Sequence, residues 1–334
     1  MKTDRTKWHV FRGMACAVAL SLLVAACGTA TPPPATDAVT VPPTDAPTQP
    51  PAAPPTQPPT APPTEPPAAP SRPLSGLGAN PQRVEFQAED GKNLVGYYYP
   101  SKYADAPVVI LMHWAGGDLT DWCEIAPWLQ NRADENPVKP ERCANAGAGL
   151  PESIAATWLD PSWFPPMNAD ASLAVFAFDF RDYGESDKGG GGPDWKLDAK
   201  AAFAAVSGFE GVDATRMASI GASIGADGAP DGCLLYNQEA GSGCVGAFSL
   251  SPGNYLGMSY AEAVTGIEPN PTWCLAAEND DSASTCNSAS GDHYRSQIYS
   301  GDAHGMILIA PDFDPLPMTL IQEFLELVFG ETMK

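Results

Sequence analysis

Residues 217–225 read MASIGASIG, and this stretch carries the strongest indication of the fold. Its beginning, Met217 to Ile220, is a mainly apolar run that predicts a buried strand. The G-x-S-x-G pattern then places Ser223 between Gly221 and Gly225, ahead of a segment with helical character. Small residues at these two positions permit a strained turn that lifts a serine hydroxyl above the edge of a sheet. Ser223 is therefore the first candidate for a nucleophile.

Strand and helix patterns continue on both sides of this stretch. Strand-like runs occur at residues 84–88, 94–99, 108–112, 174–178, 217–221, 245–250, 272–277 and 297–299. The first two are separated by a polar, Gly-containing segment at 89–93 and predict an antiparallel hairpin. Helical patterns separate several of the others, at 198–206 and at 317–329, where Pro317 begins an amphipathic segment that ends before Gly330. This alternation predicts an α/β fold with a mostly parallel sheet and helices on both faces.

Three more motifs stand where the α/β-hydrolase superfamily has them, and the domain resembles its dienelactone-hydrolase-like and serine-esterase-like members. Residues 113–117, His-Trp-Ala-Gly-Gly, follow the first buried strand, at the place of the family's oxyanion loop. Residues 179–186 are similar to its D-x-R-G-x-G-x-S turn, although Asp182 stands where the family has glycine, and residues 211–216 lead into the strand before Ser223. Pro230 lies in the helix expected after Ser223 and predicts that this helix is short or kinked.

The same resemblance selects the base among four histidines. His304 lies in a loop after the last predicted strand and before the final helix, which is the family's histidine position. His293 precedes that strand and is expected at the surface. His113 belongs to the oxyanion loop, and His9 to the N-terminal segment.

The acid is expected after the strand at 272–277. Residues 277–280 are similar to the family's G-x-x-D, which favours Asp280, with Asp281 as the alternative. The order Ser, Asp, His implies that His304 removes the proton of Ser223 during attack on an acyl carbonyl, while Asp280 orients the imidazole.

The resemblance also implies an oxyanion hole. Its donors would be the backbone amides of Ile224 and of either Ala115 or Trp114. We expect no metal or organic cofactor, because the sequence contains no phosphate loop, dinucleotide fingerprint or metal-ligand spacing of Cys and His.

The N-terminus predicts export. Four basic residues among the first twelve precede the apolar run 15–26, which is too short to span a membrane and is typical of a signal-peptide core. The run ends in Val-Ala-Ala before Cys27, which resembles the lipobox of bacterial lipoproteins. This resemblance implies removal of residues 1–26 and a lipid on Cys27 that anchors the protein on the extracytoplasmic side of a membrane. A plain secretory signal with an incidental cysteine is the alternative.

The composition divides the rest of the chain in two. Residues 27–75 form a Pro- and Thr-rich linker, for which an extended polyproline II spacer is expected. Residues 76–334 remain for the α/β-hydrolase domain. Within it, residues 118–170 form a long, Trp-rich connection, which we interpret as an insertion or lid.

Six of the eight cysteines lie in the domain, and an even number in an exported protein predicts disulfides. Six cysteines allow fifteen pairings, and zinc binding is a weaker alternative because no C-x-x-C unit is present. Since short loops close most readily, we expect pairing in sequence order. The expected bridges are Cys123–Cys143, Cys233–Cys244 and Cys274–Cys286.

The net charge of −22 argues against binding to nucleic acid or anionic lipid by charge. The expected partners are a small-molecule or short acyl substrate and, through the lipid, a membrane. The sequence leaves ester, thioester, lactone and short peptide open as substrates. The main alternative is an inactive binding lipoprotein with the same fold. A solute-binding lipoprotein is disfavoured, since it requires two α/β lobes.

Overall fold

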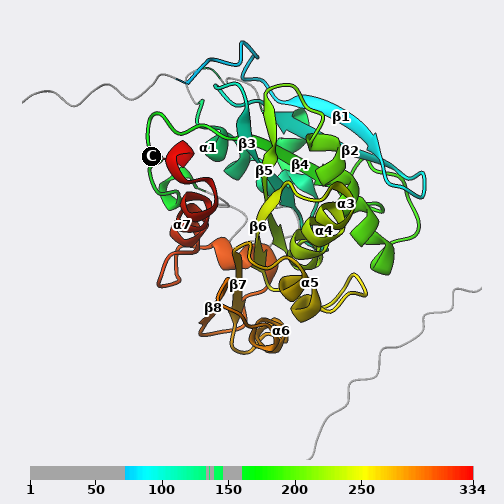
Figure 1. Cartoon of the computed structure of the whole chain (residues 1–334). Coiled ribbons are helices and arrows are strands. Elements are labelled where there is room, and N and C mark those ends of the chain that lie inside the picture. Colours follow the sequence, from blue (N-terminus) through cyan, green and yellow to red (C-terminus); the bar gives the residue numbers. More distant parts are fainter. Residues whose placement is uncertain (1–71, 133–134, 136–138, 146–159, 334) are drawn as a thin grey trace, which may run out of the picture. The chain divides into compact units, whose positions relative to one another are not determined.

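The strands of the structure follow the apolar runs of the sequence. The computed structural model describes residues 72–132, 135, 139–145 and 160–333, so the expected signal peptide, Cys27 and most of the expected linker lie outside the described residues. Within the described part, eight strands form one sheet in the order β1-β2-β4-β3-β5-β6-β7-β8 (Figure 1). Their bounds are β1 Gln82–Gln87, β2 Asn93–Tyr99, β3 Ala106–Met112, β4 Ala174–Asp179, β5 Val212–Ala222, β6 Cys244–Leu250, β7 Thr272–Ala277 and β8 Tyr294–Tyr299.

The pairing of the strands confirms the predicted architecture. β1 and β2 form the antiparallel hairpin, and β2 also pairs antiparallel with β4. From β4 to β8 all neighbouring strands are parallel. Because parallel strands point the same way, the loops that follow β3, β5, β6, β7 and β8 meet at one edge of the sheet.

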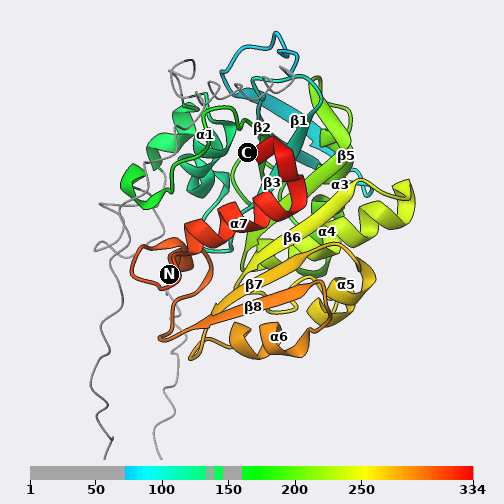
Figure 2. The same cartoon turned by 60° about the vertical axis from the view of Figure 1, so that its left-hand side comes forward.

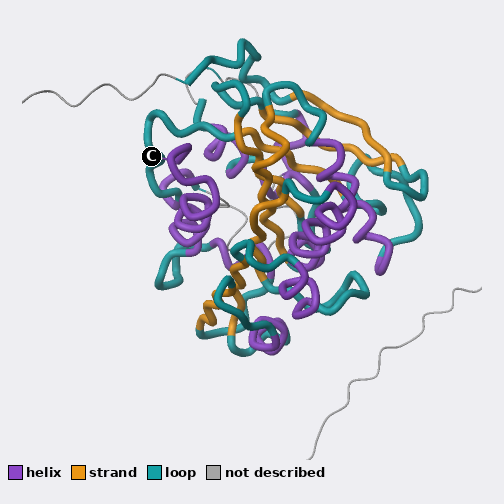
Figure 3. Tube along the Cα trace, viewed as in Figure 1, coloured by secondary structure: helices purple, strands orange, loops and turns teal. Residues whose placement is uncertain are grey.

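Helices cover both faces of this sheet, as the alternating pattern predicts. α1 (Ile125–Gln130) and α7 (Pro317–Phe329) lie on one face, and α3 (Trp195–Val206), α4 (Ile224–Ala240) and α5 (Tyr260–Gly266) lie on the other (Figures 2 and 3). The short helix α6 (Ser282–Ser288) packs beside α5 and β7. β3, β4 and β7 are buried along their whole length, which explains their unbroken apolar sequences.

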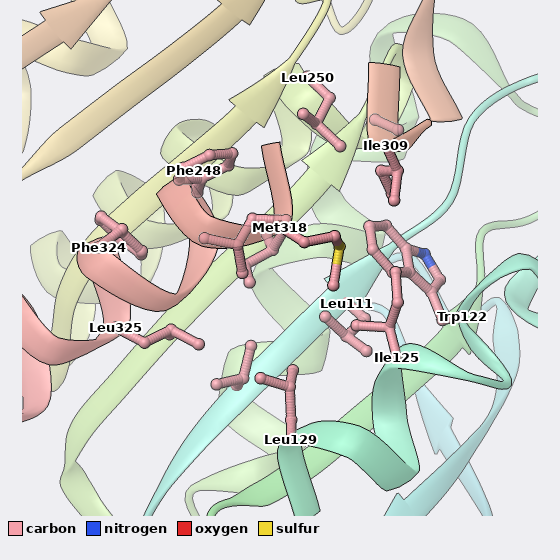
Figure 4. Close-up of a cluster of buried hydrophobic side chains, with 14 of the residues drawn as sticks. Leu111, Trp122, Ile125, Leu129, Phe248, Leu250, Ile309, Met318, Phe324 and Leu325 are labelled. Atoms are coloured by element: carbon pink, nitrogen blue, oxygen red, sulfur yellow. The ribbon is translucent and has the colours of Figure 1, made fainter. Parts of the chain in front are cut away.

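The face under α1 and α7 holds a large apolar core (Figure 4). Leu111 and Phe248 from the sheet meet Trp122 beside α1 and Phe324 from α7, and all four side chains are fully buried. Full burial of a large apolar side chain contributes about 1.5–3 kcal/mol. α7 has the bounds that the sequence predicts, and its apolar side faces the sheet.

α4 corrects the expectation of a short helix after Ser223. The helix continues for 17 residues through Pro230. Proline has no N–H to donate to the carbonyl of Ala226, four residues earlier. The Ser249 hydroxyl on β6 donates to that carbonyl instead, at 2.7 Å. A side chain from the neighbouring strand thus supplies the missing hydrogen bond.

The turn after β4 contains Asp182, which stands where the resembled family has glycine. Its φ of 76° lies in the left-handed region, where aspartate is one of the better tolerated non-glycine residues. The Asp182 carboxylate accepts hydrogen bonds from the amides of Gly189 and Gly191. These bonds hold the turn in the conformation that glycine would adopt freely.

The beginning of the Trp-rich connection is part of the core. Trp122, Ile125 and Leu129 are completely buried in the cluster under α7. Arg142, further along, forms ion pairs of 2.6 Å with Asp179 at the end of β4 and with Asp118. Residues 146–159, which include Trp158, lie outside the described residues, so a role as a lid stays a prediction.

The six domain cysteines pair in sequence order. The bridges are Cys123–Cys143, Cys233–Cys244 and Cys274–Cys286. The second joins α4 to β6, and the third joins β7 to α6. In the part of the chain that the structure describes, no helix is long and apolar enough to cross a membrane.

Candidate active site

Ser223 lies in a tight turn between β5 and α4. Its φ of 51° and ψ of −111° are strained for a residue with a side chain. The two flanking glycines make the turn possible. A Cβ at Gly221 would lie 1.8 Å from the carbonyl oxygen of Gly225, and one at Gly225 would lie 2.2 Å from that of Met112. The G-x-S-x-G pattern is thus required by backbone contacts around Ser223.

Two side chains from other loops complete a line of hydrogen bonds with Ser223. His304, in the loop after β8, has its Nε2 2.9 Å from the Ser223 Oγ. Its Nδ1 lies 2.9 Å from Oδ2 of Asp280, in the loop after β7. Three residues that are distant in sequence therefore meet at the carboxyl edge of the sheet, with the imidazole between hydroxyl and carboxylate.

The carboxylate beside His304 is stabilised in its charged form. Burial alone would raise the pKa of Asp280, but hydrogen bonds from Ser282 and His304 outweigh it and hold this pKa below its ordinary value. The Asp280 side chain is 15% exposed. Asp281 is exposed and directly precedes α6, and within the described residues it forms no hydrogen bond or ion pair with the imidazole. The geometry therefore brings Asp280, and not Asp281, to His304.

The loop after β3 lies directly beside the turn that carries Ser223. His113 is fully buried, and its Nε2 accepts the N–H of Phe180, so the ring proton is on Nδ1 and is donated to the Trp114 carbonyl at 2.7 Å. Burial also lowers the pKa of His113, which keeps the ring neutral. His113 is thus a structural residue that fixes the loop.

Trp114 and Ala115 have different surroundings. The Trp114 indole N–H donates to Asp121 at 2.8 Å, and its ring packs against Gly305, next to His304. The amide of Ala115 has no hydrogen-bond acceptor among the described residues. Ile224 begins α4, where the first amides of a helix lack partners within the helix. These two amides are therefore available as hydrogen-bond donors in the segments that follow β3 and Ser223.

His293 differs from its expectation as a surface residue. Its side chain is only 4% exposed, and its Nε2 lies 3.0 Å from the Val264 carbonyl of α5. Residues near position 293 do not indicate this burial, because the contact depends on α5 packing beside the start of β8. His293 is not part of the line of hydrogen bonds at Ser223.

Sequence reasoning missed several residues that surround this line. Ser251, which follows β6 with a φ of 61°, accepts the amide of Gly305 at 3.0 Å and its hydroxyl also contacts Asp280. Tyr255, four residues later, makes a side-chain contact with Ser223. Their position after a strand of the parallel sheet was an available signal, because loops at the carboxyl ends of such strands line sites.

A buried carboxylate in α4 holds the loop that carries Tyr255. Asp227 accepts the amides of Gly253, at 3.1 Å, and of Tyr255. Burial raises its pKa to about 6, and these amides oppose the rise. Asp231, one helical turn further, has no hydrogen-bond partner on either carboxylate oxygen among the described residues. Burial, and secondly the charge of Asp227, raise its pKa to about 8.

No group of three or more His, Cys, Asp or Glu side chains is arranged to hold a metal ion in the described ranges. The line through Ser223, His304 and Asp280 contains the residue types that nucleophilic catalysis uses. It offers a nucleophile, a base beside it and an anion that orients the base.

Comparison with known proteins identifies the fold. No protein-family model matches the sequence, and a search of curated proteins finds no match. Among solved structures, the esterase Pf2001 of Pyrococcus furiosus is similar over 78% of this chain and 100% of its own, with 17% identity and a TM-score of 0.50. The hypothetical protein PA2218 of Pseudomonas aeruginosa is similar over 74% of this chain and 93% of its own, with 12% identity and a TM-score of 0.50. At such identities the likeness concerns the fold, and this chain has the α/β-hydrolase fold that its motifs predict.

Proposed function

We propose that the protein is a serine hydrolase that cleaves a carboxylic ester or a related acyl bond through an acyl-enzyme. The observation that carries this proposal is the line of two 2.9 Å contacts from Ser223 Oγ through His304 to Asp280. The fold shared with an esterase supports an ester as the substrate class. In this proposal the three residues form the catalytic triad.

The proposed reaction moves one proton back and forth. His304 Nε2 accepts the proton of Ser223 as its oxygen attacks the acyl carbon, and the imidazolium then donates this proton to the leaving alcohol. Asp280 holds the Nδ1 proton and stabilises the cation, which its lowered pKa allows. Water repeats the sequence on the acyl-enzyme and releases the acid.

The negative oxygen of the tetrahedral intermediate would lie on the β3 side of Ser223. The amides of Ile224 and Ala115 are the proposed donors, because the contact of Gly225 with the end of β3 brings the two segments together. Loss of one such donor typically costs about 10²–10³ in kcat. The hydrogen bonds of His113 and Trp114 fix the loop that presents Ala115.

Labelling with a fluorophosphonate tests the proposal directly. The probe reacts covalently with activated serines, so the wild-type domain should be labelled, and peptide mapping should place the label on Ser223. Ser223→Ala should remove the label, whereas Ser219→Ala, in the preceding strand β5, should keep it. Absence of label in the folded wild-type protein would favour the inactive binding lipoprotein instead. A panel of p-nitrophenyl esters with rising acyl length would then define the acyl group.

We further propose that the enzyme is tethered outside a membrane by a lipid on Cys27. Three disulfides in the domain support an oxidising, extracytoplasmic compartment. Two or more acyl chains give stable anchoring. Cys27→Ser should release the protein from the membrane fraction or leave it unprocessed, and Cys16→Ser, within the expected signal core, should do neither. A processed Cys27→Ser protein that stays in the membrane fraction would exclude the lipid anchor.

A further inference from the structure

Tyr255 lies beside Ser223 without a part in the triad. It follows β6, is 40% exposed, and its side chain lies near that of Ser223. Ser223 has one hydroxyl proton, which is directed to His304. Burial, and secondly the charge of Asp227, raise the pKa of Tyr255, so the phenol keeps its proton at neutral pH.

The phenol is held in this place by its own loop and by α4. A Cβ at Gly253 would lie 2.2 Å from Cζ of Tyr255, so the ring rests directly on the Gly253 backbone. The Asp227 carboxylate accepts hydrogen bonds from the backbone N–H groups of Gly253, Asn254 and Tyr255. Since Asp227 is four residues after Ser223, it lies on the same side of α4. One helix thus fixes both the nucleophile and the loop that carries Tyr255.

The sheet order shows which substrate atom the phenol can reach. β5 lies between β3 and β6, so the proposed oxyanion donors stand on one side of Ser223 and Tyr255 on the other. His304 follows β8, which lies on the β6 side of β5, so a leaving oxygen near the imidazole lies on that side. The imidazole of His304 must reach this same oxygen to protonate it. The Tyr255 hydroxyl and His304 Nε2 therefore flank the position of the leaving group.

We propose that Tyr255 is a further catalytic residue, whose hydroxyl donates a hydrogen bond to the leaving alcohol oxygen of the substrate, and that Asp227 is its positioning residue. This inference rests on the proposed function. The proton for the leaving alcohol still comes from the His304 imidazolium. Tyr255 keeps its own proton and donates a hydrogen bond while the bond from the acyl carbon to the alcohol oxygen breaks.

The test compares acetate esters that differ only in the leaving group. Negative charge develops most on a poor leaving alcohol, so the hydrogen bond should matter for ethyl acetate and hardly at all for p-nitrophenyl acetate. We expect Tyr255→Phe to lower kcat/KM for ethyl acetate by about 10- to 100-fold and for p-nitrophenyl acetate by no more than about twofold. Tyr236→Phe is the control, since Tyr236 lines a separate pocket with Gln87 and Leu197.

Two further variants test the support of the phenol. Gly253→Ala keeps the hydroxyl but displaces the ring, and its backbone φ is not in the left-handed region, so it should reproduce the leaving-group dependence of Tyr255→Phe. Asp227→Ala should also lower kcat/KM more for ethyl acetate than for p-nitrophenyl acetate. When it is combined with Tyr255→Phe, it should add little to this difference between the two esters. Asp227→Asn keeps one acceptor oxygen and should restore part of the loss.

The outcomes separate this inference from the proposed function. If the wild-type protein neither hydrolyses esters nor reacts with the fluorophosphonate, both fail together. If the wild type is active and Tyr255→Phe is labelled but loses the same factor on both esters, or loses none, only the role of Tyr255 is overturned. If Asp227→Ala does not fold, Gly253→Ala alone decides whether the position of the phenol matters.

Discussion

The two halves of the sheet edge that carry the site are held by different means. In the nucleophile half, backbone lies against backbone: Gly221 contacts the Gly225 carbonyl, and Gly225 contacts the end of β3. In the acid–base half, Asp280 lies in a short polar loop, and the side chain of His304 is 31% exposed. A disulfide from Cys274 in β7 to Cys286 in α6 encloses this loop.

This difference predicts which structural changes each half can tolerate. Close backbone contacts leave no room for an added methyl group, but they do not depend on any cross-link. The loop of Asp280 is held by hydrogen bonds of small side chains, such as the one from Ser282 to Asp280, and by its bridge. The nucleophile half should therefore tolerate reduction of the disulfides but not larger side chains. The acid–base half should tolerate larger side chains but not reduction of its disulfide.

The largest expected effect comes from breaking the nucleophile half. Ser223→Ala removes the attacking oxygen and should lower kcat by about 10³–10⁶-fold in ester hydrolysis. The melting temperature should stay near that of the wild type, because the turn keeps its glycines. Gly225→Ala should instead destabilise the domain by about 1–3 kcal/mol or more, because its Cβ would meet the Met112 carbonyl. Wild-type turnover in Ser223→Ala would contradict the triad.

The second effect tests the acid–base half. Asp280→Asn keeps the size of the side chain but allows the wrong imidazole tautomer, and should lower kcat by about 10³–10⁴-fold. Asp281→Asn is the matched control, because Asp281 is exposed and should change kcat by less than about twofold. The pH dependence of kcat/KM for both variants completes the measurement. A reversal of the two effects would assign the acid to Asp281.

The third prediction compares the removal of two disulfides that close loops of similar length. Cys274→Ala with Cys286→Ala opens a loop of 12 residues, and Cys233→Ala with Cys244→Ala opens one of 11. Each should cost about 2–3 kcal/mol of stability. Only the first should also lower kcat, by about tenfold, at a temperature where both proteins are folded. Equal activities would show that hydrogen bonds alone hold Asp280.

The smallest effect concerns the buried carboxyl of α4. Asp231 has a pKa of about 8 in the folded protein against an ordinary value of 3.8. As the pH rises, the Asp231 carboxyl therefore loses its proton at a lower pH in the unfolded chain than in the folded protein. The free energy of unfolding thus decreases between about pH 4 and about pH 8. Asp231→Asn removes this loss. It should match the wild type in urea unfolding at pH 4 and be more stable by about 1–3 kcal/mol at pH 8.5. A difference that does not change with pH would assign Asp231 another partner.

Much of the fold could be predicted because buried segments carry strong patterns. β7 and α7 have their predicted bounds, since each has an apolar side fixed by the core. β8 was underestimated because its first residues, at 294–296, are polar or partly exposed, as suits the last strand of a sheet. α5 and α6 were missed, because seven-residue helices give too few turns for an amphipathic pattern.

The candidate site divides in the same way. Ser223, His304 and Asp280 could be predicted, because short sequence motifs and the order of the residues along the chain indicate them. Ser251, Tyr255 and Asp227 could not be found in that manner. Their roles depend on how the loop after β6 meets α4 and the loop after β8, and nothing in residues 251–255 marks that meeting.

The hydrogen bond from Ser249 to the Ala226 carbonyl has a consequence for the divergence of this sequence. Pro230 removes a donor in α4, and the hydroxyl on β6 replaces it, so the two positions form one unit although 19 residues separate them. In proteins of common descent, proline at the first position should be inherited together with serine or threonine at the second. Where another residue restores the N–H at position 230, the second position becomes free to vary among small apolar residues. The pair is thus a marker by which true descendants of this chain can be told from proteins that share only the fold.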